Sequence, residues 1–365
     1  VLIPKNGEYT LQVTMELWET SYYDEIKLHV IDHPEGSEIY VDEKFIPPPY
    51  PPHRIYSVTN KRKPLSAMDG EENNLLTLID EWDYKYISNM IPTQFQGITE
   101  PHDLVLDLGD LRNAEEVILF LHGWIFPTDA SINVNISQNP DVGVFPPFVQ
   151  VINENGDWET VIENIFFPNG KDKTCIVDLS GKFLTEDFRI RLRTSMQIYW
   201  DQVFFTVDEP KVEFKETILS IKDADLHYRG FSSIKRKGGR YGPHWPIYQT
   251  VSTSPKWRSL TGNYTRFGDV TSLLTTQDDM YVIMNSGDEM TINFPASETP
   301  ILQKGWSRDF ILYSDGWLKD GDLNTARGNT VKPLPFHTMN QFPYNADEGL
   351  RDSKNHQNYI RTYNT

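Results

Sequence analysis

Residues 188–208 alternate between apolar and polar side chains almost without fault. On an extended backbone, Ile190, Leu192 and Thr194 would point to one side and the three intervening arginines to the other. This period of two is typical of a half-buried β-strand. After residues 199–202, an apolar run at 203–207 predicts a second strand. The segment therefore indicates sheet architecture rather than catalysis.

Short strand-like runs separated by turn sequences follow one another between residues 98 and 209. They are residues 104–108, 116–122, 131–137, 148–152, 174–179, 188–196 and 203–207. Such even spacing is typical of a jelly roll or β-sandwich. We therefore expect an all-β protein with a galactose-binding-like β-sandwich at 98–209. The connector before it, residues 61–97, contains the best candidate for a short helix, at 71–82.

Strand-like runs also flank this block, at 8–15, 25–32 and 37–41 and again at 212–221, 280–284, 290–294 and 309–314. Regions 1–60 and 210–330 are therefore candidate partners in a second, discontinuous β-sandwich with long irregular loops. Five prolines within residues 46–53 predict a semi-rigid extended connector. The proline-rich residues 331–365 predict a tail that wraps around the rest.

The chain is strongly acidic, with 52 Asp plus Glu against 34 Lys plus Arg and a net charge of −18. This charge argues against duplex nucleic acid and anionic lipid as partners. No apolar run approaches the roughly 20 residues that span a bilayer. The single cysteine, Cys175, excludes an intrachain disulfide. Because the chain opens on Val-Leu-Ile-Pro, we expect a piece of a longer or processed protein.

The segment 320–324 is the strongest candidate for an ion site. Asp320, Asp322 and Asn324 alternate along a turn and offer three oxygen ligands, as Ca²⁺ requires. The EF-hand pattern fails, however, because Thr325 and Val331 stand where Gly and Glu belong. A Ca²⁺ site of another type and a polar turn with local Asx hydrogen bonds are the two interpretations.

Two other motifs predict no site. His29 and His33 have the spacing of a helical zinc motif, but the segment is strand-like. Four residues of a strand span about 13 Å, too far for both histidines to bind one ion. His122 precedes Gly123 as in a hydrolase oxyanion loop, yet the chain lacks a G-x-S-x-G nucleophile.

The run of residues 235–245 combines basic and aromatic side chains. It is interpreted as a counter-charge that docks on the acidic surface of the protein itself or of a partner.

Aromatic side chains at the end of the 188–208 segment are the candidate ligand-binding residues. Tyr199, Trp200 and Asp201, together with Trp124, could form a stacking platform at a sheet rim. A carbohydrate-binding module is therefore one alternative function. An enzyme with an unrecognised β-sandwich active site is a second alternative, for which no catalytic residues can be named.

Several segments together resemble the C-terminal region of bacterial FG-GAP and ASPIC/UnbV repeat proteins, relatives of the cartilage acidic protein group. The segments are residues 23–34, 119–134, 167–174, 191–202, 228–232, 278–283, 315–327 and 333–337. The resemblance implies an exported protein whose upstream part is an FG-GAP β-propeller. Such propellers usually bind Ca²⁺ and mediate adhesion or assembly. The resemblance attaches no catalytic residues to this region.

These observations favour a non-enzymatic interaction or structural module outside the cytoplasm, in the periplasm, at the cell surface or secreted. Its expected partners are other proteins or its own upstream β-propeller, with carbohydrate as the alternative ligand. Nucleic acid is not expected as a partner.

Overall fold

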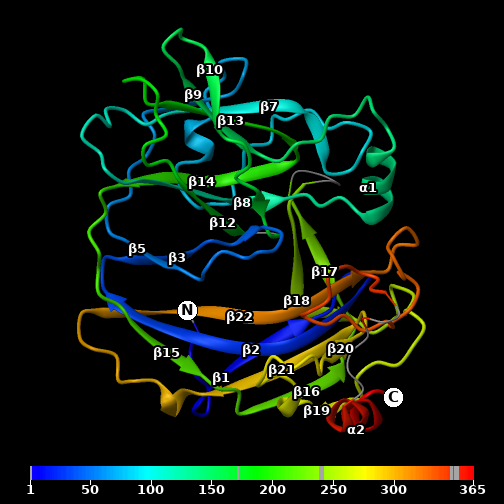
Figure 1. Ribbon diagram of the computed structural model, residues 1–365. Helices are drawn as coiled ribbons and strands as arrows, with labels where there is room; N and C mark the ends of the chain where they lie inside the picture. Colours follow the sequence, from blue (N-terminus) through cyan, green and yellow to red (C-terminus); the bar gives the residue numbers. More distant parts are fainter. Residues whose placement is uncertain (1, 171, 238–241, 346–347, 349–352) are drawn as a thin grey trace.

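Strands dominate the protein, with 44% of residues in strands and 8% in helices. The computed structural model describes residues 2–170, 172–237, 242–345, 348 and 353–365. Every pairing between its named strands is antiparallel. The strands form two lobes, one above the other in Figure 1. The prediction of a mostly β protein is confirmed.

The upper lobe of Figure 1 contains two sheets on either side of one apolar core. In spatial order, the first sheet consists of β10 (Trp158–Ile162), β9 (Phe148–Ile152), β13 (Arg189–Met196), β7 (Ile98–Asp107) and β6 (Ser66–Met68). The second consists of β12 (Lys173–Asp178), β8 (Val117–Ile125) and β14 (Ile198–Val207). Ile190 and Leu192 are buried in the core and Arg189 is exposed, as the alternation predicts.

The lower lobe also contains two sheets around one core. One consists of β1 (Glu8–Thr14), β21 (Asp288–Pro295), β16 (Asp223–Tyr228) and β19 (Gly268–Asp269). The other consists of β15 (Lys215–Leu219), β2 (Glu19–Pro34) and β20 (Val282–Met284), with β22 (Trp306–Asp320) paired along all of β2. Residues 8–34 thus form sheets with residues 215–320.

The remaining elements connect or cover the two lobes. The strands are β3 (Glu38–Val41), β4 (Lys44–Phe45), β5 (Ile55–Val58), β11 (Phe167–Pro168), β17 (Phe231–Arg236) and β18 (His244–Ser252). The helices are η1 (Leu76–Leu78), α1 (Ala130–Ser137), η2 (Thr271–Leu273), η3 (Ala296–Glu298) and α2 (Lys354–Tyr363). The pair β3 and β5 lies between the lobes (Figure 1).

Two expected elements were wrong. Residues 131–137 alternate like a strand but form α1. The Asp129 side chain caps this helix by accepting a hydrogen bond from the Ile132 N–H. No residue of α1 is buried, so its alternation does not reflect a sheet face. In the connector 61–97, the helix expected at 71–82 is only the single 3₁₀ turn η1.

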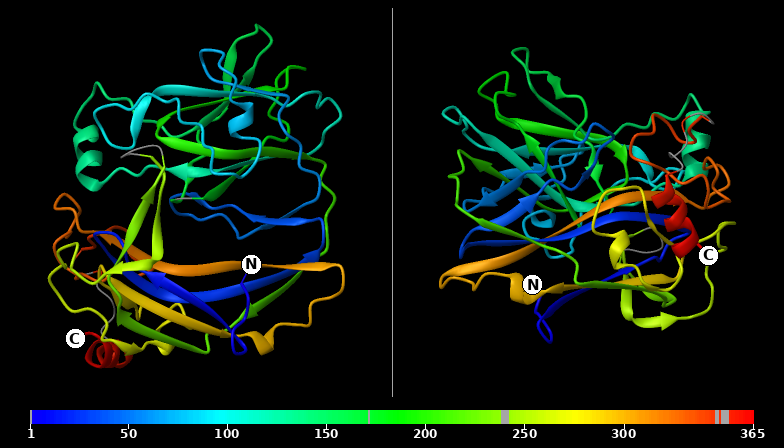
Figure 2. Two further views of the ribbon diagram at one scale, coloured as in Figure 1. Left: turned by 180° about the vertical axis from the view of Figure 1, so that it is seen from behind. Right: turned by 60° about the horizontal axis from the view of Figure 1, so that its bottom comes forward.

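A two-stranded arm, β17 and β18, rises from the lower lobe to the upper lobe (Figures 1 and 2). At its tip, Trp245 Nε1 donates a hydrogen bond to Asp172, 3.1 Å away. Lys237 Nζ donates to the Tyr84 carbonyl. The basic and aromatic run 235–245 therefore docks within the protein itself. Residues 238–241 of that run lie outside the described part of the chain.

The two lobes repeat the same set of backbone contacts. The Val203 N–H in β14 donates to the Ile79 carbonyl at 2.9 Å, just after η1. In the lower lobe, the Ile26 N–H in β2 donates to the Leu274 carbonyl at 3.0 Å, just after η2. The corresponding strands are β13 and β1, β14 and β2, β6 and β16, β7 and β21, and β8 and β22.

The order of these strands differs between the lobes. In the upper lobe, β13 and β14 come last, whereas their counterparts β1 and β2 are the first strands of the chain. The upper lobe is thus inserted in the chain between β2 and β15 of the lower lobe. Because the order is permuted, the repetition has no fixed period along the sequence.

Candidate functional site

The candidate site is built around Asp24, which lies in a β-bulge of β2. The pairing of β2 with β22 shifts between Tyr23 and Glu25, so Asp24 has no partner residue across the ladder. A bulge re-aims a side chain out of the regular alternation. Asp24 is fully buried and its carboxylate accepts the N–H groups of Asp278 (3.3 Å) and Asp279 (3.0 Å).

His337 brings the C-terminal segment to this bulge. Its Nδ1 lies 2.6 Å from Asp279 Oδ1 and 3.6 Å from Asp24 Oδ2. Its Nε2 lies 2.7 Å from Asp315 Oδ1 on β22. The Tyr281 hydroxyl also donates to Asp279 Oδ1, at 2.7 Å. Four segments far apart in the sequence therefore meet at one imidazole.

The electrostatics of the site favour a positive charge at His337. Burial raises the pKa of Asp24 to about 6, against the opposing effect of the two N–H donors. Burial alone would lower the pKa of His337, but hydrogen bonds to Asp279 and Asp315 outweigh it and raise that pKa. The side chains of His337, Asp279 and Asp315 are 28%, 20% and 20% exposed, so solvent and ions reach the site.

The donor set suits a divalent transition metal. One ligand atom each from Asp24, Asp279 and His337 lies within 4.8 Å of the other two. Imidazole favours ions such as Zn²⁺ over Ca²⁺ or Mg²⁺, and carboxylates accompany it in many such sites. Asp315 holds the other ring nitrogen, as carboxylates commonly do for metal-binding histidines. An ion here would replace the proton on Nδ1.

The upper lobe repeats the framework of this site, that is, a buried aspartate in a bulge, two backbone N–H donors and a glycine opposite the bulge. The other side chains around the aspartate differ. Asp201 lies in a bulge of β14, is fully buried and accepts the N–H groups of Asp83 (3.3 Å) and Tyr84 (3.0 Å). Tyr84 and its counterpart Asp279 both have a φ of +63° and both backbones are strained there. Asp315 has His122 as its counterpart, since each precedes the glycine opposite the bulge.

The remaining predicted ligand residues belong to the packing of the upper lobe. Trp124, Tyr199 and Trp200 are 3%, 7% and 4% exposed. Trp124 and Tyr199 pack with Tyr86 and Phe126, beneath the tip of the arm. These rings therefore offer no open face for stacking on a sugar. Asp201 is bound to backbone N–H groups as described above.

The predicted ion ligands of segment 320–324 form hydrogen bonds within the protein. Asp320 Oδ1 accepts the Asp322 N–H at 2.9 Å, and Asp322 Oδ1 accepts the Asn324 N–H at 2.7 Å. Asp322 Oδ1 also accepts from the Ser131 hydroxyl at 2.8 Å, which ties the turn to α1. These bonds favour the second interpretation, a polar turn with Asx hydrogen bonds.

The sequence contained a signal for the bulges, although the site itself was missed. Tyr22-Tyr-Asp-Glu-Ile26 and Tyr199-Trp-Asp-Gln-Val203 are similar, as are Asp315-Gly-Trp317 and His122-Gly-Trp124. Comparison of these short segments would have identified Asp24 as the counterpart of Asp201.

No protein-family model, curated protein or solved structure matches the chain. Within the described residues, no helix is both long and apolar enough to cross a membrane.

Proposed function

We propose that this chain is a non-enzymatic, metal-binding interaction module that acts outside the cytoplasm. The observation that carries the proposal is the convergence of Asp24, Asp279 and His337 within 4.8 Å, with Asp315 on the other nitrogen of the imidazole. An ion there would link β2, the turn before β20 and the C-terminal segment. The ion's main effect would be to fix the surface formed by residues 331–345 for a partner.

Two further points support this reading. Eight strands in two sheets around one core are the number in a jelly roll, which supports a galactose-binding-like sandwich in the upper lobe. Such folds serve many binding functions, so the fold alone assigns none. The resemblance to the C-terminal region of FG-GAP and ASPIC/UnbV proteins supports protein partners or an upstream β-propeller.

The proposal is tested by calorimetric titration of the metal-free protein with Zn²⁺ and Mn²⁺, and by thermal unfolding with each ion. A ligand at a hundredfold excess over its Kd adds about 2.7 kcal/mol to the free energy of unfolding. We expect this stabilisation for the wild type and a smaller one, with one bound ion fewer, for Asp279→Asn. Partner capture from the periplasmic and surface fraction, with and without chelator, then tests the interaction role.

Asp278→Asn is the matched control, because Asp278 lies on the same turn but outside the metal-ligand group. Its Oδ1 accepts the Met280 N–H at 3.1 Å, which an asparagine oxygen can also do. Equal metal responses of Asp279→Asn and wild type would reject the site.

Carbohydrate binding has one observation of its own. A cavity of about 300 Å³ in the upper lobe is lined in part by the polar residues Asp69, Asn89 and Asp103. This volume is at the lower end for small-ligand sites. Glycan-array binding that is lost in Asn89→Ala would favour this second function, and no binding across the array would oppose it.

A further inference from the structure

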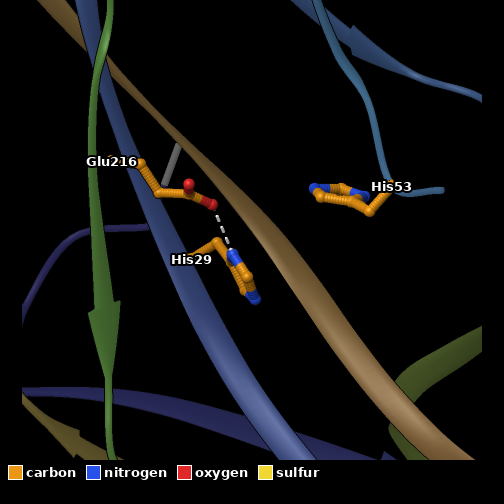
Figure 3. Close-up of side chains that lie close together, drawn as sticks. All are labelled: His29, His53 and Glu216. Atoms are coloured by element: carbon orange, nitrogen blue, oxygen red, sulfur yellow. Dashed lines mark hydrogen bonds and ion pairs between the residues drawn. The ribbon is translucent and has the colours of Figure 1, made fainter.

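A second cluster of metal-ligating side chains lies on the face of the sheet formed by β15, β2 and β22 that points away from the core residues Leu28 and Val30. His29 is on β2 and Glu216 is on the neighbouring strand β15, where Glu216 pairs with Ile31 and Ile218 pairs with His29. His53 comes from the proline-rich connector 46–53. Figure 3 shows the Glu216 carboxylate and the His53 ring facing each other, with the His29 ring beside them. Three separate parts of the chain therefore meet at this cluster.

The contacts of His29 are incomplete. Its Nδ1 lies 2.6 Å from Glu216 Oε1, but its Nε2 is buried and has no hydrogen-bond partner in the part of the chain that is described. His33, four residues along the same strand, has Ser37 on Nδ1 at 3.0 Å and Asp309 on Nε2 at 3.2 Å. Both ring nitrogens of His33 thus have a hydrogen-bond partner, whereas His29 has one on Nδ1 alone.

We propose that His29, His53 and Glu216 form a Zn²⁺ site, independent of the cluster at Asp24. One ligand atom from each residue lies within 4.8 Å of the other two. Two imidazoles and one carboxylate are a common donor set for zinc, with the fourth position open to water or to another ligand. Glu216 supplies one negative charge, so the bound ion keeps a net charge of about +1, which suits an anionic fourth ligand.

Only small movements are needed to bind the ion. Zinc bonds of about 2.0–2.1 Å place tetrahedral ligand atoms roughly 3.3 Å apart. The His29–Glu216 contact at 2.6 Å would lengthen as the ion replaces the shared proton, and the wider separations would shorten. His53 is exposed, so it can make most of this adjustment.

Such an ion would attach the connector to the lower lobe. The connector joins β4 to β5, and β5 pairs with β3 between the two lobes (Figure 1). Within the described residues, His53 forms no hydrogen bond, and its ring centroid lies 5.8 Å from that of His29. Zinc would therefore reduce the freedom of residues 46–53 and restrain the ribbon between the lobes.

The test is a titration of the metal-free protein with Co²⁺, followed by visible absorption, and with Zn²⁺ by calorimetry. We expect His53→Ala to lose one equivalent of bound ion, or to bind it at least about tenfold more weakly. Asp279→Asn should retain this equivalent, which separates the site from that at Asp24. Hydrogen exchange in residues 46–58 should slow when Zn²⁺ is added to the wild type and not when it is added to His53→Ala.

Tyr50→Ala is the matched control, because Tyr50 lies in the same connector and is 70% exposed. Glu216→Gln provides a second variant from a different strand, with an unchanged side-chain size. Wild-type stoichiometry and affinity in both His53→Ala and Glu216→Gln would overturn the proposal. Loss of the ion in Tyr50→Ala to the same extent would also overturn it.

Discussion

Asp24 and Asp201 occupy the same place in two lobes, yet their surroundings differ. Each is a fully buried aspartate in a bulge that accepts two successive backbone N–H groups. Beside Asp24 the turn residue is Asp279 and the His337 imidazole lies 3.6 Å away, whereas beside Asp201 the turn residue is Tyr84. A buried aspartate beside a strained turn residue would by itself suggest a site. The repetition shows that the aspartate belongs to the fold, so the proposed metal site depends on the two residues that differ between the lobes, Asp279 and His337.

The largest expected effect tests the shared framework. Asp201→Ala and Asp24→Ala should each lower the free energy of unfolding by about 3 kcal/mol, because two backbone N–H groups lose their buried, charged acceptor. Urea unfolding in the presence of chelator measures both. A loss below about 1 kcal/mol in either variant would show that its bulge does not depend on the aspartate.

The glycines opposite the bulges test the same framework from the partner strand. A Cβ at Gly123 would lie 2.6 Å from the Tyr199 carbonyl oxygen, and one at Gly316 would overlap the Tyr22 carbonyl oxygen even more closely. Overpacking of this kind costs about 1–3 kcal/mol. Thermal unfolding should show Gly316→Ala to be the less stable of the two variants. The reverse order would contradict the geometry of the lower bulge.

Lys319 on β22 has as its counterpart in the upper lobe the buried Phe126, the residue that directly follows β8. Burial lowers the pKa of Lys319 to about 8, below its unfolded value. Between about pH 8 and 10.5 the unfolded state binds more protons, so stability rises with pH relative to a variant without the amine. Lys319→Met should be more stable than wild type at pH 7 by on the order of 1–2 kcal/mol.

The relative advantage of Lys319→Met should shrink as the pH rises from 8 to 10. Urea unfolding of both proteins across this range gives the difference directly. The Val331 carbonyl, which accepts from Lys319 Nζ, keeps the Tyr22 hydroxyl at 2.6 Å in the variant. A difference that is constant with pH would show that Lys319 is not desolvated.

The smallest effect on stability is expected for Asp279→Asn. This side chain is 20% exposed and asparagine keeps an oxygen for the Tyr281 hydroxyl, so the loss in chelator should be below about 1 kcal/mol. The same substitution should reduce the free energy of metal binding by much more than it reduces the free energy of unfolding. A severe loss of stability without metal would instead assign Asp279 to the framework, like Asp24.

The strand content could be predicted from the sequence because burial on one face of a sheet leaves a period of two. The prediction succeeded at residues 188–207, where the two strands β13 and β14 belong to different sheets. It failed at α1, where alternation occurs on an exposed helix capped by Asp129. Alternation therefore identifies a strand only where one face is buried.

The candidate site could not be predicted, because it depends on contacts between distant segments. The fold brings Asp24 and His337 together, and no spacing in the sequence indicates their contact. His53 likewise lies near His29 only because the fold places the connector beside β2. The aromatic residues Trp124, Tyr199 and Trp200 were prominent in the sequence, but these large side chains are buried in the upper lobe. The repetition of Tyr-x-Asp in both lobes was hidden by the permuted strand order.

The most direct test of the central comparison is an anomalous difference map from crystals grown with Zn²⁺. We predict a peak bonded to Asp24, Asp279 and His337, and no peak at the equivalent position beside Asp201 and Tyr84. A map without density at His337, or with equal density at both bulges, would contradict the assignment of metal binding to the lower lobe.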